Sequence, residues 1–132
     1  MGRRRRGGPG TGTRHVTDQS VRLHRWDEIA LEKITELISR KIVAGEREML
    51  AQIYLKKGAL VPMHAHESEQ MTYVLQGTLK FLIGGEEVTV REGDVLHIPP
   101  GLPHQAEALD DTFELDVFAP IRSDWLTSAE ED

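Results

Sequence analysis

Residues 58–70 of this 132-residue chain read GALVPMHAHESEQ, and the rest of the sequence is interpreted outward from them. His64 and His66 are two residues apart, so on an extended strand both imidazoles point to the same face. His104 follows 38 residues after His66, just past the turn expected at 99–101. Two imidazoles cannot complete a metal shell, but a third from a neighbouring strand can, with an oxygen donor added. Surface histidine pairs often bind nothing, so the wider spacing has to decide.

The segments around these histidines predict a protein built from β-strands. Residues 49–55 alternate with a period of two and stop at Lys57-Gly58. Gly84-Gly85 is a two-residue hairpin signal. Strands are also expected over residues 72–75, 79–83, 88–90, 95–98 and 112–118. Many short strands separated by turn residues indicate an all-β sandwich or barrel in a single domain.

The ends of the chain differ in composition from its middle. Residues 1–19 carry five arginines among glycines and are expected to form a basic tail, while residues 127–132 form an acidic one. We expect the domain to occupy residues 20–126, beginning with an N-terminal arm. The isoleucines and leucines of residues 21–45 fit either a helix or a strand. The β-branched end of residues 38–43 favours an irregular arm followed by a strand.

Charge and composition exclude several classes of function. Residues 1–14 hold five arginines and no acid, which leaves 11 basic against 22 acidic residues and a net charge of −11 in the remainder. Such a body repels phosphate backbones, so specific nucleic-acid binding is not expected. No apolar run approaches the about 20 residues that span a bilayer, and none follows the basic N-terminus as in a signal peptide. The absence of cysteine excludes thiolate sites and fits a reducing cytoplasm.

Two spaced motifs resemble those of the cupin family. The first reads Gly58-x5-His64-x-His66-x3-Gln70-x6-Gly77, and the second reads Gly93-x5-Pro99-x-Gly101-x2-His104. The likeness covers roughly residues 48–120. It implies a small jelly-roll barrel that holds one divalent transition metal ion (Zn, Ni, Fe or Mn). The metal ligands that it implies are His64, His66, Gln70 and His104.

The chain departs from the family pattern at two positions. Gln70 stands where a Glu is usual, and Ala108 stands where the second motif often ends in Asn. A neutral amide ligand would leave a divalent metal its full charge and make it a stronger Lewis acid; the alternative is that Gln70 only hydrogen-bonds a metal-bound water. The remaining histidines lie outside both motifs and are not expected to be ligands; they are His15, His24 and His97.

A narrower resemblance concerns the run LDVFAPIR at residues 115–122, which is similar to the closing segment of the KdgF-like group of cupins. That group is associated with opening unsaturated monouronates released from pectin and alginate. The resemblance implies that Asp116 is the acid/base group and that Phe118 and Arg122 line the pocket. Alternation puts Glu114, Asp116 and Phe118 on one face of the strand, without saying which face points inward. The alternatives are a solvated Asp116, a core Phe118, and an Arg122 paired with Asp124.

The leading functional hypothesis is a metal-dependent isomerase or lyase that opens or ketonises small unsaturated uronates. Three imidazoles with open metal positions are also compatible with a dioxygenase, and a third possibility is a sensor that binds a small molecule without turnover. A small-molecule substrate and no membrane partner are expected. The arm over residues 21–45 carries enough isoleucine and leucine to pack on a second copy, so we predict a homodimer.

Overall fold

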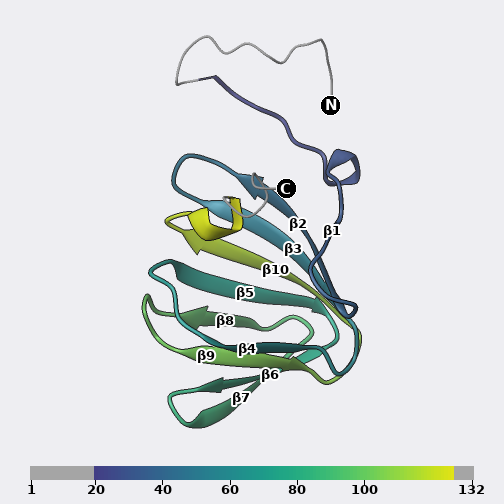
Figure 1. Cartoon of the computed structure of the whole chain (residues 1–132), viewed down its shortest axis with the longest axis vertical. Coiled ribbons are helices and arrows are strands. Elements are labelled where there is room, and N and C mark those ends of the chain that lie inside the picture. Colours follow the sequence, from purple (N-terminus) through teal and green to yellow (C-terminus); the bar gives the residue numbers. More distant parts are fainter. Residues whose placement is uncertain (1–19, 127–132) are drawn as a thin grey trace.

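The computed structural model describes residues 20–126, which form two antiparallel β-sheets (Figure 1). The six-stranded sheet has the order β1-β2-β3-β10-β5-β8, and the four-stranded sheet has the order β4-β9-β6-β7. The strands are β1 (Glu32–Lys33), β2 (Ile38–Ala44), β3 (Met49–Leu55), β4 (Leu60–His64), β5 (Glu69–Gln76), β6 (Thr78–Ile83), β7 (Glu86–Arg91), β8 (Val95–Ile98), β9 (His104–Ala108) and β10 (Thr112–Ala119). This is the jelly-roll architecture, and the predicted all-β single domain is confirmed.

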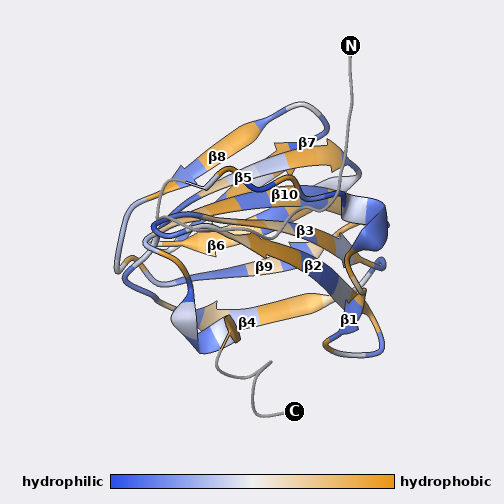
Figure 2. Cartoon of the chain, turned by 90° about the horizontal axis from the view of Figure 1, so that it is seen from above, coloured by the Kyte–Doolittle hydropathy of each residue, from blue (hydrophilic) through white to orange (hydrophobic). Residues whose placement is uncertain are grey.

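The inward faces of the two sheets form one core. Along β3 the burial alternates as the sequence predicts: Met49, Ala51, Ile53 and Leu55 are buried, and the residues between them are more exposed. The four-stranded sheet contributes Leu79, Phe81, Val90 and Ala106 to the same core. Coloured by hydropathy, strands of both sheets show hydrophobic and hydrophilic stretches in turn (Figure 2). The strands that supply these core residues therefore each turn one face inward, as the period of two requires.

The N-terminal arm is irregular before it joins the sheet. It contains a short 3-10 helix, η2 (Trp26–Glu28), and the two-residue strand β1, which the sequence analysis did not predict. The expected strand over residues 38–43 is confirmed as β2, which pairs with β3. None of the helices in the described part of the chain could span a membrane. The predicted tails, 1–19 and 127–132, lie outside the described residues.

Strand β10 lies between β3 and β5, in the middle of the six-stranded sheet. Its buried residues are Thr112, Glu114, Asp116 and Phe118, whereas Phe113, Leu115 and Val117 are half-buried on the other face. On β5 the buried positions are Gln70, Thr72 and Val74. The direction that the sequence left open is thereby settled, because Asp116 points into the barrel. Two neighbouring strands thus bring polar side chains into an interior that is otherwise largely apolar.

Glycine is needed at several turns of the fold, but the physical reason differs from one position to another. Gly84 and Gly85 have positive φ angles of 58° and 81° between β6 and β7, which confirms the predicted hairpin turn. Gly77 has a φ of 96°, and a Cβ built on it would lie 2.4 Å from the backbone oxygen of Asp111. Gly58 has a similar φ of 90° with no atom within 4 Å of such a Cβ. Gly77 is therefore required by close approach as well as by conformation.

Replacing Gly77 with Ala should destabilise the fold by more than about 1 kcal/mol, since it adds a clash to the strain of a positive φ. The matched control is Gly58→Ala, which introduces the strain without the clash and should cost less. Urea unfolding midpoints of the two variants and the wild type measure the difference. Equal losses for both variants would contradict the close-approach explanation.

The homodimer stays a prediction. Five large apolar side chains of the arm are exposed: Val21 at 95%, Leu23 at 74%, Leu31 at 56%, Ile34 at 43% and Leu37 at 39%. Light scattering at micromolar concentration should give twice the mass of one chain for the wild type. A double variant, Leu31→Glu with Ile34→Glu, should shift that mass toward one chain, because charges on a packed apolar surface oppose association. A wild-type mass of one chain would refute the dimer.

Candidate metal centre

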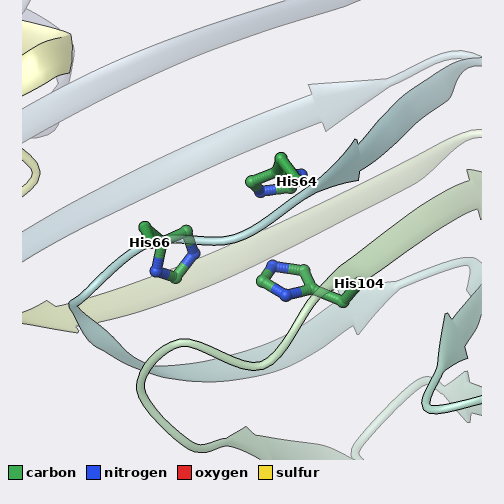
Figure 3. Close-up of side chains that lie close together, drawn as sticks. All are labelled: His64, His66 and His104. Atoms are coloured by element: carbon green, nitrogen blue, oxygen red, sulfur yellow. The ribbon is translucent and has the colours of Figure 1, made fainter.

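Three histidines meet at one end of the barrel, and we call them the three-histidine cluster: His64, His66 and His104 (Figure 3). The ring centroids of His64 and His104 are 4.4 Å apart, and those of His66 and His104 are 5.0 Å apart. Each residue can offer one ligating nitrogen, and these three atoms lie within 4.8 Å of one another. The spacing in the sequence therefore does bring the three predicted imidazoles together.

The cluster is assembled differently from the shared strand face that we predicted for its first two histidines. Strand β4 ends at His64, and His66 lies two residues beyond it, in the connection to β5. His104 begins β9, which pairs with β4 so that His64 is opposite His104. The backbone N–H of Gly101 donates to the carbonyl of His66 at 2.8 Å, which joins the two connections. A hydrogen bond between loops thus positions His66, instead of strand periodicity.

Backbone carbonyls fix the orientation of all three imidazoles. Nδ1 of His64 lies 2.8 Å from the Pro62 oxygen, Nδ1 of His66 lies 2.9 Å from the Ser68 oxygen, and Nδ1 of His104 lies 2.8 Å from the Leu102 oxygen. A carbonyl oxygen only accepts, so each Nδ1 must carry the hydrogen. In a neutral ring this leaves the lone pair on Nε2. The three rings are therefore in the tautomer that binds a metal through Nε2, with the other nitrogen held by an outer partner.

Two further observations are consistent with a cation bound at the cluster. Nε2 of His104 is buried and has no hydrogen-bond partner among the described residues, which is costly for a polar atom without a ligand. Nε2 of His66 lies 3.0 Å from Oε1 of Gln70. If His66 keeps its hydrogen on Nδ1, both facing atoms are acceptors, and a positive ion that both contact removes their repulsion. The three-histidine cluster can hold a metal ion, and Gln70 is placed to add an oxygen donor.

The electrostatics favour the neutral form of two of these rings, His66 and His104. Burial lowers the pKa of His66, and the positive charge of Arg122 lowers it further. Burial also lowers the pKa of His104, with smaller contributions from His64 and His66. An imidazole with a lowered pKa is protonated only at lower pH, so its lone pair is free for a cation at neutral pH.

A hydrogen-bond chain leads from the cluster to Asp116. Nε2 of Gln70 donates to Oγ1 of Thr72 at 2.8 Å, and the Thr72 hydroxyl donates to Oδ1 of Asp116 at 2.7 Å. Gln70, Thr72 and Asp116 are all less than a tenth exposed. The chain fixes the amide of Gln70 with its oxygen toward His66. The predicted acid/base residue is thus connected to the predicted ligands through Thr72, which the sequence analysis did not single out.

The other predicted pocket residues lie around Trp125. Arg122 pairs with Asp124 at 3.1 Å from Nε and 2.9 Å from Nη2, and this is the alternative partner considered from the sequence. These hydrogen bonds lower the pKa of Asp124. Phe118 is 1% exposed, with ring centroids 5.6 Å from His66 and 5.1 Å from Trp125. Trp125 also stacks against the guanidinium of Arg122 at 4.6 Å, so an aromatic and cationic stack closes this side of the core.

A pocket of about 350 Å³ opens beside the cluster, lined by residues 66–68 and 120–124. The hydroxyl of Ser68 donates to the carbonyl of Pro120 at 2.6 Å and ties its two walls together. Arg122 lines this pocket, whereas Asp116 and Phe118 do not, and the substrate contact predicted for Arg122 stays a prediction. For Phe118, the predicted contact with substrate stays a prediction, and its observed place is in the core.

The other described histidines, His24 and His97, lie away from the three-histidine cluster. His97 on β8 is about half exposed, and its Nε2 lies 2.6 Å from a carboxylate oxygen of Glu69, which makes it a surface residue. His24 is exposed in the arm and is not part of the cluster. His15 lies outside the described residues.

Comparisons with known proteins agree with this geometry. The cupin domain family matches residues 51–119. This chain belongs to the cupin family. The pectin degradation protein KdgF of Dickeya dadantii is 29% identical to this cupin over 103 residues, which cover 76% of this chain and 94% of that protein. The structure of KdgF from Halomonas sp. is similar with a TM-score of 0.71 and 31% identity, over 75% of this chain and 94% of that one.

A protein of Methanocaldococcus jannaschii, MJ1618, is 33% identical over 75 residues. The match covers 56% of this cupin and only 60% of that relative's length. The similarity to the KdgF proteins, by contrast, spans nearly their whole length. The predicted resemblance to the KdgF-like group is therefore confirmed.

Three residues near the three-histidine cluster and Asp116 were not predicted as functional candidates from the sequence: Thr72, Glu114 and Trp125. A signal was present for two of them. Thr72 shares the alternating face of Gln70, and Glu114 shares that of Asp116. Trp125 carries no periodic signal, because it belongs to a helical turn over residues 123–126 after the last strand. Its packing depends on how the chain leaves β10.

Replacing His66 with Ala should lower metal affinity sharply, because it removes a ligating nitrogen. Loss of a residue that only supports a ligand typically costs about 10–100-fold in affinity, and loss of the ligand itself should cost more. The melting temperature in the presence of metal should fall as well, since metal bound to the folded state stabilises it. Metal content by elemental analysis and thermal melting measure both effects. His97→Ala is the matched control and should change neither. Full metal content and unchanged melting of the His66 variant would exclude it as a ligand.

Proposed function

We propose that this cupin is a metal-dependent enzyme of the isomerase or lyase type that opens small unsaturated uronates. The observation that carries the proposal is the buried carboxyl group of Asp116, joined through Thr72 and Gln70 to the three-histidine cluster. Carboxyl groups are seldom fully buried without a partner or a role. The similarity to KdgF proteins supports a role in pectin degradation.

The residues that would hold the metal are His64, His66 and His104, with Gln70 as an oxygen donor. We propose a divalent transition metal, Zn, Ni, Fe or Mn, because each accepts imidazole nitrogen together with oxygen. When bound, such an ion would act as a Lewis acid toward an oxygen on which negative charge develops. Since all four donors are neutral, they would not offset its charge.

The proposed reaction moves one proton within the substrate. A 4,5-unsaturated uronate in its ring form has a hydroxyl on C1 and an enol ether at C4, C5 and the ring oxygen. Loss of the hydroxyl proton forms the C1 carbonyl, the bond from C1 to the ring oxygen breaks, and that oxygen becomes the C5 carbonyl while C4 takes up a proton. A single carboxylate that removes the first proton and delivers it to C4 leaves the atoms balanced.

Asp116 is the residue to which we assign this transfer. Burial raises its pKa, while the side-chain hydrogen bonds with Glu114 and Thr72 and the charge of Arg122 act in the opposite direction. A carboxylate with a raised pKa is a stronger base, and its conjugate acid can return the proton near neutral pH. Because Asp116 does not line the pocket, the reacting carbons would have to extend past His66 toward β10.

Arg122 is the residue to which we assign the substrate carboxylate. Its guanidinium lines the pocket, and two of its nitrogens donate to Asp124. A guanidinium has five N–H donors, so donors remain for a second carboxylate group. Planar bidentate pairing makes arginine well suited to that task.

Replacing Asp116 with Asn should lower turnover of a 4,5-unsaturated uronate by about 10²–10⁴-fold, the usual contribution of a general acid–base group. The amide keeps the volume and can still accept from Thr72, so metal content and folding should be preserved. Ring opening is followed by the loss of the conjugated double bond in ultraviolet absorbance. The matched control is Asp110→Asn, an exposed carboxylate on the connection before β10 that should leave the rate unchanged.

Different outcomes favour the other hypotheses. A wild-type rate for the Asp116 variant would refute its role. Oxygen uptake with an aromatic substrate, and none of the uronate reaction, would favour a dioxygenase. Saturable binding of a small molecule without turnover by the metal-loaded protein would favour a sensor.

A further inference from the structure

A second carboxyl group is buried beside the one that the proposed function uses. Glu114 lies two residues before Asp116 on the inward face of β10 and is 5% exposed, against 4% for Asp116. The two side chains lie within hydrogen-bond reach of each other. We call them the carboxyl pair. Nothing in the proposed reaction requires Glu114, so its burial needs another explanation.

The surroundings of Glu114 cannot support a negative charge. Its backbone neighbours across the sheet are Ile53 on β3 and Val74 on β5, and both of these side chains are buried and apolar. Its Oε1 atom is buried without a hydrogen-bond partner among the described residues. An ionised carboxylate left in this way would be far more costly than a neutral one. Burial, and the neighbouring charge of Asp116, raise the pKa of Glu114 well above its ordinary value.

The surroundings of Asp116, by contrast, supply what stabilises an ionised carboxylate, namely a hydrogen-bond donor and a nearby positive charge. The Thr72 hydroxyl donates to it at 2.7 Å. The positive charge of Arg122, which follows β10, favours the ionised form of Asp116. Arg40 of β2 is also a buried cation, but it forms an ion pair with Glu32 at 2.9 Å and stacks over the ring of Trp125. Of the two carboxyl groups, Asp116 is the better place for the negative charge.

We propose that Glu114 carries the one proton of the carboxyl pair at neutral pH and donates it in a hydrogen bond to Asp116, which it thereby holds ionised and in position. Glu114 is in this sense a positioning residue, acting through Asp116. Its importance for turnover rests on the proposed function. The position of the proton does not, because it follows from the contacts of the pair.

The proton on Glu114 also has a consequence for the metal ligands. Asp116 as an acceptor requires the Thr72 hydroxyl to donate to it, and the Thr72 oxygen is then free to accept from Nε2 of Gln70. The Gln70 oxygen is thereby turned toward His66. A proton on Asp116 that was donated to Thr72 would reverse the chain and turn the amide nitrogen toward the cluster. The donor in Glu114 therefore helps to keep an oxygen available for a metal.

Infrared spectroscopy locates the proton without any activity measurement. At pH 7 the wild type should show the carbonyl stretch of a protonated carboxylic acid, and Glu114→Gln should lose that band. The matched control is Glu107→Gln, a partly exposed glutamate on β9 paired with Lys80, which should keep it. A band that survives in Glu114→Gln and disappears in Asp116→Asn would place the proton on Asp116 and overturn the proposal. The absence of the band from the wild type would overturn it too.

Stability against pH gives a second readout, with a definite sign. Because the pKa of Glu114 is higher in the folded state than in the unfolded one, the unfolded chain releases this proton first as the pH rises. The wild type should therefore lose stability from the ordinary glutamate pKa up toward the folded one. Glu114→Gln has no such proton, so its melting temperature relative to wild type should climb over that window. A constant difference would contradict a protonated Glu114.

The pH profile of kcat/KM tests the positioning role. Glu114→Leu removes the donor and should move the acidic limb to higher pH by about one to two pH units, the worth of one hydrogen bond to a charged group. Glu114→Gln keeps an N–H donor and should restore the wild-type limb. A mere loss of packing would lower stability in the Leu variant without moving the limb, and that result would overturn the positioning role. If the wild type does not turn over uronates, the proposed function fails while the infrared band still decides where the proton is.

Discussion

Three backbone carbonyls, those of Pro62, Ser68 and Leu102, set the chemistry at this end of the barrel. Each accepts from Nδ1 of the histidine two residues away in the chain, so the rings can turn only slightly and all present Nε2 inward. Ser68 and Leu102 belong to connections, and Pro62 lies where the pairing of β4 with β9 shifts register between Val61 and His64. The loops around the cluster therefore belong to the candidate metal centre as much as the histidines do.

The interior of the barrel is largely apolar, and its buried polar residues are concentrated on β5 and β10. On β10 and β5 the inward positions near the centre are Asp116, Gln70 and Thr72, whereas β3 on the far side of β10 contributes Met49, Ala51 and Ile53. A carboxyl group in such a place costs stability that an apolar residue would not. Proteins commonly accept that cost at functional sites, because a preorganised polar group cannot be supplied by the solvent. The carboxyl pair is limited to one negative charge, which keeps the cost low.

Much of the strand arrangement could be predicted from the sequence, because side-chain alternation and turn conformation depend on neighbouring residues in the chain. The period of two placed residues 49–55 and 112–118 on strands, and Gly84-Gly85 marked a hairpin by conformation alone. The cluster was predictable through the family spacing, although the strand ends at His64 and a bond between loops positions His66. The inward direction of Asp116 and the stack of Trp125 on Arg122 were not predictable from the alternation. They depend on which neighbours β10 acquires in the sheet, and that is a property of the tertiary fold.

The amide at position 70 follows from the same chain of hydrogen bonds. Gln70 has an oxygen toward His66 and an N–H group that donates to Thr72, so it serves the cluster and the carboxyl pair at once. The Glu that the family pattern more often has at this position could offer oxygens only. Thr72 would then lack a donor to its oxygen or would turn its own hydrogen toward the Glu, and Asp116 would lose a hydrogen bond. A carboxylate there would also add a second negative charge close to Asp116. The departure from the usual cupin motif therefore fits the proposed single charge on Asp116 beside the candidate metal ligands.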